Sequence, residues 1–433
     1  MKALLGGLVA VLALAWAAAW SLAPASTAHP WWIAYQQLLY LSGLLAIGLL
    51  SLATFLAARP AWLETPLGGM DRIYRTHKWA GILGGVFAIL HWLIEMSDDL
   101  LKSSIGRAGR VPKEKFGNIL DSLRHLAGDL GEWGFYLLVV LVAITLWQRF
   151  PYRNWRFLHR AMPVLYLLLA FHSVLLAPAT YWTQPSGWLL GLFVALGSYG
   201  ALRSLLGNVG RGRSVRGRIV ELETLADDVL RVRCRLDAGW RGHRPGQFAL
   251  VTFDRAEGAH PFTIADADRG DACVEFCIKA LGDYTRRLPA TLAVGSPVVV
   301  EGPYGRFELA RRRADVRQLW VAGGIGVTPF LAWLAALQET PAVAQAELHY
   351  CTRDRERDPF VARLQALCAG LPGVRLRVHG AAQGERLDAD ALLAGRGGPA
   401  EVWFCGPAGL AGALRDGLGR QVRRFHQEAF RMR

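Results

Sequence analysis

Long apolar runs without acidic or basic residues dominate the first half of the chain. Residues 3–23 and 29–58 are each long enough to cross a bilayer, which takes about 20 residues. Shorter apolar runs lie at 79–94 and 133–148, and residues 161–202 contain no Asp, Glu, Lys or Arg. The turn-forming segment APATYWTQPSG divides this last run into two spans. The pattern therefore predicts six membrane-spanning helices.

The first apolar run has two interpretations. Lys2, the apolar core and the segment LAPAS together resemble a signal peptide with its cleavage site. The run is longer than the apolar core of about 7–15 residues in a usual signal peptide, which favours a retained helix. The second span runs in the same direction in both cases.

The second half changes to short alternating segments mixed with charge and glycine. VLRVRCRL, GQFALVTF, CVEFCIKAL and PVVVEGPYG predict a small antiparallel barrel over residues 211–310. QLWVAGGIGVTPFLAWLAAL has the pattern of a buried strand, a glycine-rich turn and an apolar helix, which predicts an α/β domain over residues 315–433. The expected fold is multidomain, with a six-helix transmembrane bundle over residues 1–206 before these two domains.

Composition and charge exclude several classes of protein. A hydrophobic content of 52% is too high for a soluble protein. The formal charge is +14, but no basic stripe with interleaved aromatic residues is present, so nucleic-acid binding is not expected. The charge suits membrane topology and attraction to anionic lipid or an anionic cofactor. The six cysteines contain no C-x-x-C pair, which argues against zinc, disulfides and covalently attached haem and indicates reduced cytoplasmic thiols.

Basic residues in the loops set the expected orientation. The loops at 59–78 and 149–160 each carry four Lys or Arg, whereas those at 24–30 and 177–187 carry none. The segment 97–131 runs against this rule, with six basic residues on the predicted outer side. We expect a multi-pass protein of the plasma (cytoplasmic) membrane, in contact with lipid, whose second half lies in the cytoplasm.

Four histidines in the apolar half form two pairs. His77 and His91 bracket the third span, and His159 and His172 bracket the first part of the fifth. Each separation is roughly 20 Å along a helix, so these two spans side by side would match the histidines at two heights. On a straight helix, side chains thirteen residues apart point in directions that differ by about 140°. The fifth span therefore needs a kink, for which Pro163 is the candidate.

Neutral imidazole is a strong axial ligand for haem iron, and ligation gives it a reason to lie in lipid. A lone histidine in a membrane more often makes only a hydrogen bond. Two pairs at matching heights instead predict two stacked haems, a path for electrons across the membrane.

Three segments of the predicted barrel are spaced for a flavin: RPGQFALVTF (244–253), HPFTIAD (260–266) and KALGDYTRRL (279–288). Backbone and threonine donors can hold the ring and the pyrophosphate, and Phe262 can lie near the isoalloxazine. Each segment alone is a weak signal, because PFT equally fits an ordinary strand end.

The α/β part carries a glycine-rich turn in which Gly323, Gly324 and Gly326 let backbone N–H groups approach a pyrophosphate. The turn is not G-x-G-x-x-G, so close packing explains it equally well. Further on, Arg353 and Arg355 occupy the place of a 2′-phosphate site.

Two further features of this part have alternative readings. Asp354, between the two arginines, suits ribose hydroxyls instead of a phosphate. In EVWFCGPAGL (401–410), Cys405 stands beside a Gly-Pro that shapes a pocket, and for this cysteine alone a buried core position is the alternative.

The ordered set of motifs resembles the ferric reductase and NADPH oxidase superfamily. H-x13-H and H-x12-H in a six-span half precede HPFT, GDYT, GPYG, VAGGIGVTP, CGP and a terminal aromatic segment. The resemblance covers nearly the whole chain, and the combined order is specific although no single motif is.

This resemblance implies two b-type haems, FAD, and NADPH or NADH as cofactors. His77 and His159 would ligate the haem on the cytoplasmic side, and His91 and His172 the outer haem. The residues expected to line FAD are His260, Pro261, Phe262, Thr263, Lys279, Gly282 and Thr285. Those expected at the nicotinamide nucleotide are Gly323, Gly324, Gly326, Thr328, Pro329, Arg353, Cys405, Gly406 and Pro407.

Two departures from the superfamily pattern concern the reaction. Some relatives end on an aromatic residue that stacks on the flavin, whereas here Phe430 would take that role from inside the tail FHQEAFRMR. Oxygen-reducing members usually carry a second histidine one turn past the outer ligand and an arginine in the second span. Here Glu95 occupies the first position and the second span is uncharged, which argues against superoxide as product. Glu95 would either recruit a cation or be merely solvated.

The sequence therefore predicts an enzyme, an NAD(P)H-dependent transmembrane oxidoreductase that passes electrons through FAD and two haems to an extracytoplasmic acceptor. A ferric chelate is favoured as acceptor, and dioxygen, reduced to superoxide, is the alternative. A haem-binding sensor or carrier without NAD(P)H activity is more remote, because the flavin and nucleotide motifs are complete. The sequence indicates no particular protein partner.

Overall fold

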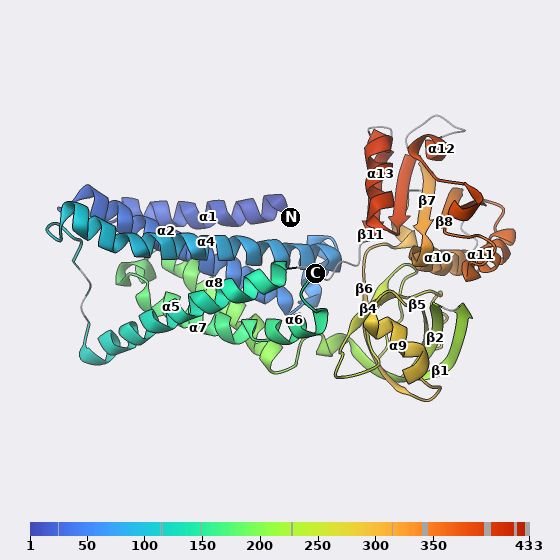
Figure 1. Cartoon of the computed structure of the whole chain (residues 1–433), viewed down its shortest axis with the longest axis horizontal. Helices are drawn as coiled ribbons and strands as arrows, with labels where there is room; N and C mark the ends of the chain where they lie inside the picture. Colours follow the sequence, from blue (N-terminus) through green and yellow to red (C-terminus); the bar gives the residue numbers. More distant parts are fainter. Residues whose placement is uncertain are drawn as a thin grey trace. The chain divides into compact units, whose positions relative to one another are not determined.

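The computed structural model of this chain divides into two compact units, Met1–Val209 and Gly210–Met432. Helices make up the first unit, and two sheets with their helices make up the second (Figure 1). The structure describes all residues except 25, 113, 115, 148, 227, 314, 340–344, 394–399, 420–421 and 429–433.

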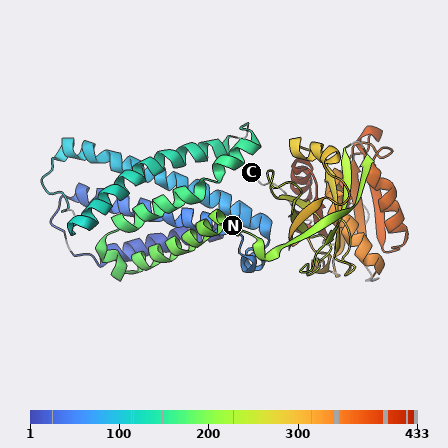
Figure 2. The same cartoon turned by 90° about the horizontal axis from the view of Figure 1, so that it is seen from below.

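The first unit contains six stretches of helix that are long and apolar enough to cross a membrane, counted over the described residues. These run side by side in a bundle (Figure 2), which confirms the predicted six spans. Their helices are α1 (Lys2–Ser21), α2 (Pro30–Ala57), α4 (Met70–Ile105), α5 (Asn118–Leu146), α6 (Tyr152–His159) with α7 (Met162–Leu176), and α8 (Pro185–Leu205). The connections hold the short helices η1 (Ala61–Leu63), α3 (Glu64–Leu67) and η2 (Ala179–Thr183).

The third span is longer than its apolar run predicts. Helix α4 continues through polar residues on both sides of 79–94 and ends at Gly106, which has a positive φ of 72°. Its last turns are supported by an ion pair between Lys102 and Asp98, four residues apart. The sequence placed the apolar segment correctly but gave no stop signal for the helix before this glycine.

The fifth span is broken, as the spacing of its histidines requires. Helix α6 ends at His159 and helix α7 begins at Met162. Pro163 lies in the first turn of α7, where its missing N–H costs nothing because that group has no partner within a helix. The expected kink is therefore confirmed as a break between two helices.

Helix α2 lies at the centre of the bundle and contacts α1, α4, α7 and α8. It is the most buried of the candidate spans. Small residues allow the close approach, since a Cβ on Gly200 of α8 would overlap the Thr54 carbonyl of α2. The neighbours of α2 are thus held at short distances along its length.

The second unit begins with a six-stranded antiparallel sheet in the order β4-β3-β6-β1-β2-β5. A bridge between Ile264 and Phe276 joins the two ends of this sheet and closes it into the predicted barrel. Apolar side chains fill its interior. The strands are β1 (Ser214–Ala226), β2 (Val229–Leu236), β3 (Phe248–Thr252), β4 (His260–Thr263), β5 (Cys273–Lys279) and β6 (Pro297–Tyr304), with helix α9 (Asp283–Thr291) before the last. The short helices η3 (Arg211–Arg213) and η4 (Leu309–Arg311) lie before and after the barrel.

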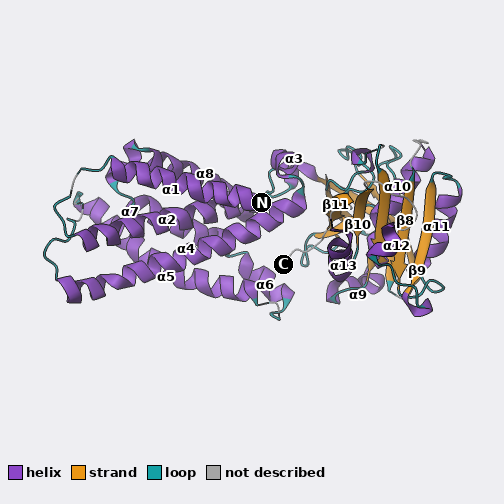
Figure 3. Cartoon of the chain, turned by 90° about the horizontal axis from the view of Figure 1, so that it is seen from above, coloured by secondary structure: helices purple, strands orange, loops and turns teal. Residues whose placement is uncertain are grey.

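A five-stranded parallel sheet follows, in the order β11-β10-β7-β8-β9 (Figure 3). Helices α10 and α11 pack on one face and α12 and α13 on the other, which confirms an α/β arrangement. The strands are β7 (Arg317–Gly323), β8 (Ala346–Thr352), β9 (Val374–Gly380), β10 (Ala400–Cys405) and β11 (Val422–Glu428). The helices are η5 (Gly324–Val327), α10 (Thr328–Glu339), α11 (Pro359–Ala369), η6 (Ala381–Gln383), α12 (Ala389–Leu393) and α13 (Ala408–Leu418).

Trp333 of α10 joins the parallel sheet to the barrel. Its side chain is fully buried, and its indole N–H donates to the carbonyls of Pro245 at 3.1 Å and Phe307 at 3.2 Å. The Phe307 ring stacks on the indole with centroids 5.1 Å apart. One side chain therefore satisfies two buried carbonyls that lie outside the strands.

Replacing Trp333 with phenylalanine keeps an aromatic ring but removes the N–H. We expect a loss of about 1–3 kcal/mol of unfolding free energy, because the Phe307 carbonyl loses the indole N–H and the Pro245 carbonyl keeps the longer bond, of 3.4 Å, from the Leu309 N–H. Calorimetry should show a fall in the melting temperature of about 2–4 °C per kcal/mol. Trp240→Phe is the matched control, because the Trp240 N–H has no hydrogen-bond partner in the described part of the chain. Equal shifts in the two variants would contradict the prediction.

Candidate functional site

The four histidines of the first unit come together as two pairs. The ring centroids of His77 and His159 are 6.1 Å apart, and those of His91 and His172 are 6.3 Å apart. The two planes of each pair are nearly perpendicular, at 82° and 90°. The structure thus confirms the pairing expected from the sequence, between the third span and the broken fifth span.

Three of the four imidazoles are oriented by helix carbonyls. Nδ1 of His77 lies 2.8 Å from the Ala53 oxygen, and Nδ1 of His91 lies 3.0 Å from the Leu39 oxygen. Ala53 and Leu39 are both on α2 and are separated by fourteen residues, the same spacing as the two histidines. The antiparallel helix α2 therefore holds both rings of α4.

Nδ1 of His172 lies 2.8 Å from the Ala127 oxygen of α5. A carbonyl only accepts, so each of these three rings carries its proton on Nδ1 and leaves Nε2 as a free electron-pair donor, the state of a metal-binding histidine. His159 differs, because its Nδ1 has no hydrogen-bond partner among the described residues and its ring stacks on Trp155 at 5.1 Å.

Glycines make room for the outer pair. A Cβ on Gly131 of α5 would overlap the His172 imidazole, and one on Gly43 of α2 would lie 3.1 Å from the His91 ring. Analysis of the sequence missed both glycines, because neither belongs to a recognisable spacing. The inner pair does not depend on such clearance from any glycine among the described residues.

The gap between the rings fits a haem iron. Two imidazoles bonded to one metal ion, each by a bond of about 2 Å, have their centroids about 6 Å apart. Both pairs show this separation. Two neutral imidazole nitrogens are a ligand set that would hold a haem iron.

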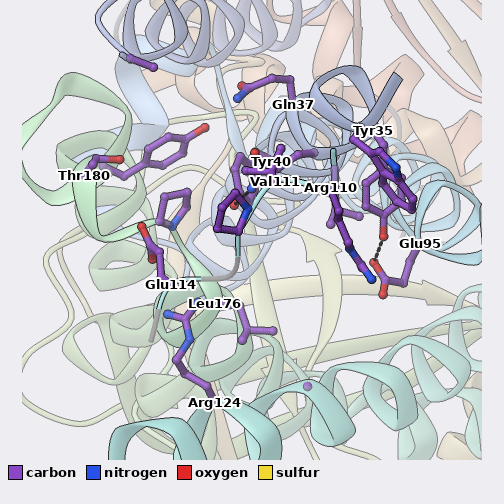
Figure 4. Close-up of a pocket in the computed structure, with 18 of the residues that line it drawn as sticks. Tyr35, Gln37, Tyr40, Glu95, Arg110, Val111, Glu114, Arg124, Leu176 and Thr180 are labelled. Atoms are coloured by element: carbon purple, nitrogen blue, oxygen red, sulfur yellow. Dashed lines mark hydrogen bonds between the residues drawn. The ribbon is translucent and has the colours of Figure 1, made fainter. Parts of the chain in front are cut away.

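A cavity of about 620 Å³, drawn in Figure 4, adjoins the His91–His172 pair, because its lining includes Leu39, whose carbonyl oxygen contacts the His91 ring. Glu95 alone among its lining residues was expected from the sequence as a site residue. The others come from separate helices and loops, so no local spacing marks them. They include the aromatic residues Trp20, Trp32, Tyr35, Tyr40 and Tyr181.

Glu95 is not merely solvated, because its carboxylate accepts a hydrogen bond of 2.8 Å from the Tyr35 hydroxyl (Figure 4). Arg110 lies beside this pair, stacks over the Trp32 ring at 5.0 Å and forms an ion pair of 2.8 Å with Asp98. A guanidinium group thus stands next to the uncharged second span although it comes from a distant loop. Two other basic residues of the segment 97–131 also have local partners, Lys102 with Asp98 and Arg124 with the Leu175 carbonyl.

The residues expected to line a flavin lie on β4 and around the start of α9. His260, Pro261, Phe262 and Thr263 form β4 itself, and Lys279 is the last residue of β5. His260 stacks on Tyr284 of α9 with centroids 4.2 Å apart, which brings the two groups together. The Thr285 hydroxyl accepts from the Gly282 N–H at 3.0 Å.

The Lys279 ammonium makes an ion pair of 3.0 Å with Asp228, at the end of the barrel sheet. Its charge is therefore already compensated within the barrel. The nine-residue helix α9 leaves its first N–H groups at the Gly282 end, where they can meet a pyrophosphate.

The glycine-rich turn lies at the switch point of the parallel sheet. From β7 the chain moves to β8 and β9, and it then returns to the other side of β7 with β10. Ligands of open α/β sheets bind at the carboxyl ends of the strands where the order reverses. Gly323 is the last residue of β7 and Gly324 follows it there, and Cys405 is the last residue of β10 and Gly406 follows it.

These two turns touch through glycines. A Cβ on Gly326 would overlap the Cys405 carbonyl, and one on Gly406 would lie 2.9 Å from the Gly323 nitrogen. Stretches eighty residues apart in the sequence thus form one surface, which also includes Pro407, 2.6 Å from a Cβ on Gly323. Thr328 and Pro329 begin α10 behind it and are buried, and the Thr328 hydroxyl donates to the Ile325 carbonyl.

Cys405 is buried at the end of β10. Burial and the neighbouring Glu428 carboxylate raise the pKa of its thiol well above its usual range, so the thiol stays protonated at neutral pH. A protonated thiol is not a nucleophile, so this residue can shape a pocket but is not suited to covalent chemistry. Phe430 lies outside the described residues.

The two arginines after β8, Arg353 and Arg355, differ in whether they form an ion pair. Arg355 forms an ion pair of 3.0 Å with Glu385, whereas the exposed Arg353 side chain makes no ion pair within the described residues. Asp354 accepts from the Gln383 amide at 2.8 Å. Arg353 is therefore the guanidinium that remains available to a phosphate.

Two family profiles match the chain. Residues 42–170 match the family described as "Ferric reductase like transmembrane component", and residues 214–308 match an FAD-binding domain. The first range contains all of His77, His91 and His159 but ends two residues before His172. The second spans the barrel strands β1 to β6.

Individual relatives resemble parts of the chain. Vanillate O-demethylase oxidoreductase of Pseudomonas sp. (strain HR199) is 34% identical over 36% of this chain and 50% of its own length. Respiratory burst oxidase homolog protein E of Arabidopsis thaliana is 28% identical over 45% of this chain and 23% of its own length. The reductase component of a Ralstonia naphthalene 1,2-dioxygenase/salicylate 5-hydroxylase system is 29% identical over 50% of this chain and 69% of its own length.

The chain spans half or less of the length of the first two of these relatives. The two profile matches, in contrast, fall on both units and in the expected order. Paired histidines in a six-span bundle, followed by a barrel and a parallel nucleotide-binding type of sheet, agree with that order. This chain therefore belongs to the ferric reductase and NADPH oxidase superfamily and is a multi-pass membrane protein.

Proposed function

We propose that this protein is an NAD(P)H-dependent transmembrane oxidoreductase that carries electrons through FAD and two b-type haems to an acceptor on the far side of the membrane. The observation that carries the proposal is the presence of two imidazole pairs, at two heights of one bundle, each with the ring separation that a single iron requires. Reduced-minus-oxidised spectra of the purified protein, with haem and flavin contents per chain, test it. A preparation without haem after expression with ample haem would overturn it.

In this proposal His77 and His159 hold one haem through Nε2, and His91 and His172 hold the other. Bound there, each haem supplies an iron that accepts and releases one electron at a time. The carbonyls of Ala53, Leu39 and Ala127 fix the tautomer of three ligands and so keep Nε2 available.

The barrel, residues 211–310, is assigned to FAD. Residues His260 to Thr263 offer a strand edge, and the N-terminus of α9, which begins after Gly282, offers a place for a pyrophosphate. FAD accepts a hydride and passes its electrons on singly, which NAD(P)H cannot do. Phe430 is proposed to cover the flavin from the tail.

The parallel sheet, residues 315–433, is assigned to the nicotinamide nucleotide. The surface formed by Gly323–Gly326 and Cys405–Pro407 at the switch point supports this assignment, because glycines there let a ligand approach the backbone. Arg353 is proposed to meet a 2′-phosphate. The second unit is proposed to lie in the cytoplasm and the bundle in the plasma membrane, with the cavity on the outer side.

For the acceptor, ferric iron is the first candidate and dioxygen the second. The match to the family described as "Ferric reductase like transmembrane component" supports ferric iron. The similarity to a respiratory burst oxidase homolog supports dioxygen. Membrane vesicles supplied with NADPH distinguish them. Superoxide dismutase removes cytochrome c reduction by superoxide, whereas a ferrous chelator captures the product of ferric reduction.

Replacing His91 or His172 with alanine should remove one haem and leave FAD reduction by NAD(P)H intact, because only one iron loses an axial ligand. Pyridine haemochrome spectra give the haem content, and stopped-flow absorbance gives the flavin reduction rate. His125→Ala is the control, because this exposed histidine belongs to neither pair. Two haems per chain in either variant would disprove the ligand assignment.

Gly131→Ala should also lower the content of the outer haem, although it leaves all four histidines in place. The added methyl group would overlap the His172 ring and force it out of position. Gly81→Ala is the matched control, because a Cβ at that position of α4 meets nothing within 4 Å. Haem content and the splitting of the reduced absorption bands provide the measurement, and an unchanged spectrum in Gly131→Ala would contradict the prediction.

Arg353→Ala should raise the KM for NADPH about tenfold and leave that for NADH unchanged, because a charged hydrogen bond to the 2′-phosphate is lost. Arg355→Ala should have a smaller effect, since that side chain is engaged with Glu385. Steady-state kinetics with both nucleotides provide the test. Equal changes for NADPH and NADH would remove Arg353 from the 2′-phosphate site.

A further inference from the structure

The cavity beside the outer histidine pair is built from the residues that hold this pair. Leu39 lines it and provides the carbonyl that receives the His91 Nδ1–H. Gly128 lines it one residue after Ala127, whose carbonyl receives the His172 Nδ1–H. Leu176 lines it one turn after His172. A molecule bound in the cavity is therefore next to the outer pair.

The cavity is far larger than an inorganic acceptor needs. Its volume of about 620 Å³ lies in the range of about 300–1,000 Å³ that organic ligands and cofactors occupy. Dioxygen has only two atoms. For comparison, a water molecule takes only about 30 Å³ of liquid volume. The size points to an organic molecule of one or two rings.

The charges on the walls favour a neutral molecule. The lining includes four carboxylates, Glu95, Glu114, Asp121 and Asp129, and only two guanidinium groups, Arg110 and Arg124. This excess of negative charge repels an anionic chelate. The carboxylates also do not converge on one ion, because Glu95 and Glu114 lie on opposite sides of the cavity (Figure 4).

Several of these carboxylates already have partners of their own. Glu114 accepts from the Ala179 N–H at 3.2 Å, and Asp121 accepts from the Phe116 N–H at 3.2 Å. Glu95 accepts from the Tyr35 hydroxyl. These groups hold the cavity in shape and leave its centre to a ligand.

Aromatic side chains provide flat surfaces for a ring. Five of them line the cavity: Trp20, Trp32, Tyr35, Tyr40 and Tyr181. The rings of Trp32 and Tyr35 lie 5.7 Å apart and those of Tyr40 and Tyr181 lie 5.8 Å apart, so two aromatic pairs contribute to the walls. Such surfaces bind a planar conjugated ring better than they bind a hydrated ion.

The Tyr35–Glu95 pair adds a path for protons. Glu95 is exposed, so its carboxyl exchanges protons with water, and Tyr35 is partly buried and reaches it from α2 with a bond of 2.8 Å. A hydroxyl and a carboxyl in contact can pass a proton to a ligand in the same cavity. Ferric iron becomes ferrous and dioxygen becomes superoxide without a proton, so the pair suits an acceptor whose complete reduction consumes protons.

We propose that the cavity binds a neutral quinone, and that Tyr35 and Glu95 supply the protons for its reduction to a hydroquinone. The inference rests on the proposed function, which delivers the electrons. Each NAD(P)H oxidised releases two electrons and one proton on the side of the second unit. The quinone takes up both electrons and two protons from the cavity side, so that both carbonyl oxygens become hydroxyl groups.

The test compares two acceptors with the detergent-solubilised holoprotein and NADPH. One is 2,3-dimethoxy-5-methyl-1,4-benzoquinone, a neutral soluble quinone, and the other is ferricyanide, which takes one electron and no proton. The rate that survives in His91→Ala, where electrons can leave only from the flavin or the remaining haem, is subtracted from each. Glu95→Gln should then lower kcat with the quinone about tenfold or more without lowering the ferricyanide rate, because ferricyanide takes no proton and the cavity loses a negative charge.

Tyr35→Phe should have the same selective effect as Glu95→Gln. The matched control is Glu132→Gln, because Glu132 also accepts a hydrogen bond from a tyrosine, Tyr136 of α5 at 3.3 Å, but does not line the cavity. This control should keep both rates. A loss of quinone reduction in Glu132→Gln equal to that in Glu95→Gln would overturn the proton role.

Binding is measured independently of turnover. Equilibrium dialysis of the quinone against the oxidised protein should show one site, and Gly128→Phe should weaken it about tenfold. A Cβ at Gly128 meets nothing within 4 Å, so the phenyl group can enter the cavity without displacing the helix. Equal binding by wild type and Gly128→Phe would remove the quinone from this cavity.

The remaining outcomes separate this inference from the proposed function. A protein that reduces ferricyanide but not the quinone keeps the proposed function and overturns the inference. A kcat/KM for ferric citrate above that for the quinone also overturns it in favour of iron. A protein with haem and flavin that reduces neither acceptor beyond the His91→Ala rate refutes both.

Discussion

A buried imidazole in an apolar bundle needs a partner for each of its nitrogens, and this requirement organises the first unit. Three Nδ1–H groups find helix carbonyls, on α2 and α5, and each ring then faces its counterpart on the other span. Because Leu39 and Ala53 repeat the spacing of His91 and His77, the register of α2 against α4 serves both rings at once. A shift of one helix by a turn would remove both hydrogen bonds. The central position of α2 and the glycines that let its neighbours approach follow from this need.

The broken fifth span solves a problem of helical phase. Thirteen residues on one straight helix place two side chains on different faces, whereas both histidines must face α4. Ending α6 at His159 and starting α7 at Met162 resets the phase. The two pairs then differ in support, because the His172 ring relies on the Gly131 clearance and a carbonyl, while the His159 ring relies on stacking with Trp155.

In the second unit, the order of the strands plays the organising part that the buried histidines play in the first. A parallel sheet whose chain reverses direction after β9 leaves β7 and β10 adjacent, and their two glycine turns pack edge to edge. Only residues without a Cβ allow that contact, so backbone atoms form this surface, to which a phosphate or an amide ring can come close. The buried Trp333 then fixes this sheet against the barrel through two carbonyls. In both units, therefore, the positions of backbone groups determine where the side chains of the candidate sites can lie.

The sequence by itself determined the elements and their local chemistry. Apolar length predicted the spans, alternation predicted the barrel, and the spacing of histidines predicted both the pairs and the break near Pro163, because these are properties of neighbouring residues along one chain. The ends of α4 were not predicted from the sequence, because polar residues with local ion pairs continue a helix as well as apolar residues do. Only the tertiary structure decided the cavity, in which Tyr35, Arg110, Arg124 and Tyr181 come from separate segments to line it together with Glu95. Only it showed that the absence of a Cβ at Gly131 makes room for the His172 ring. The physical reason is that such contacts depend on the register between helices, which packing decides and no single segment encodes.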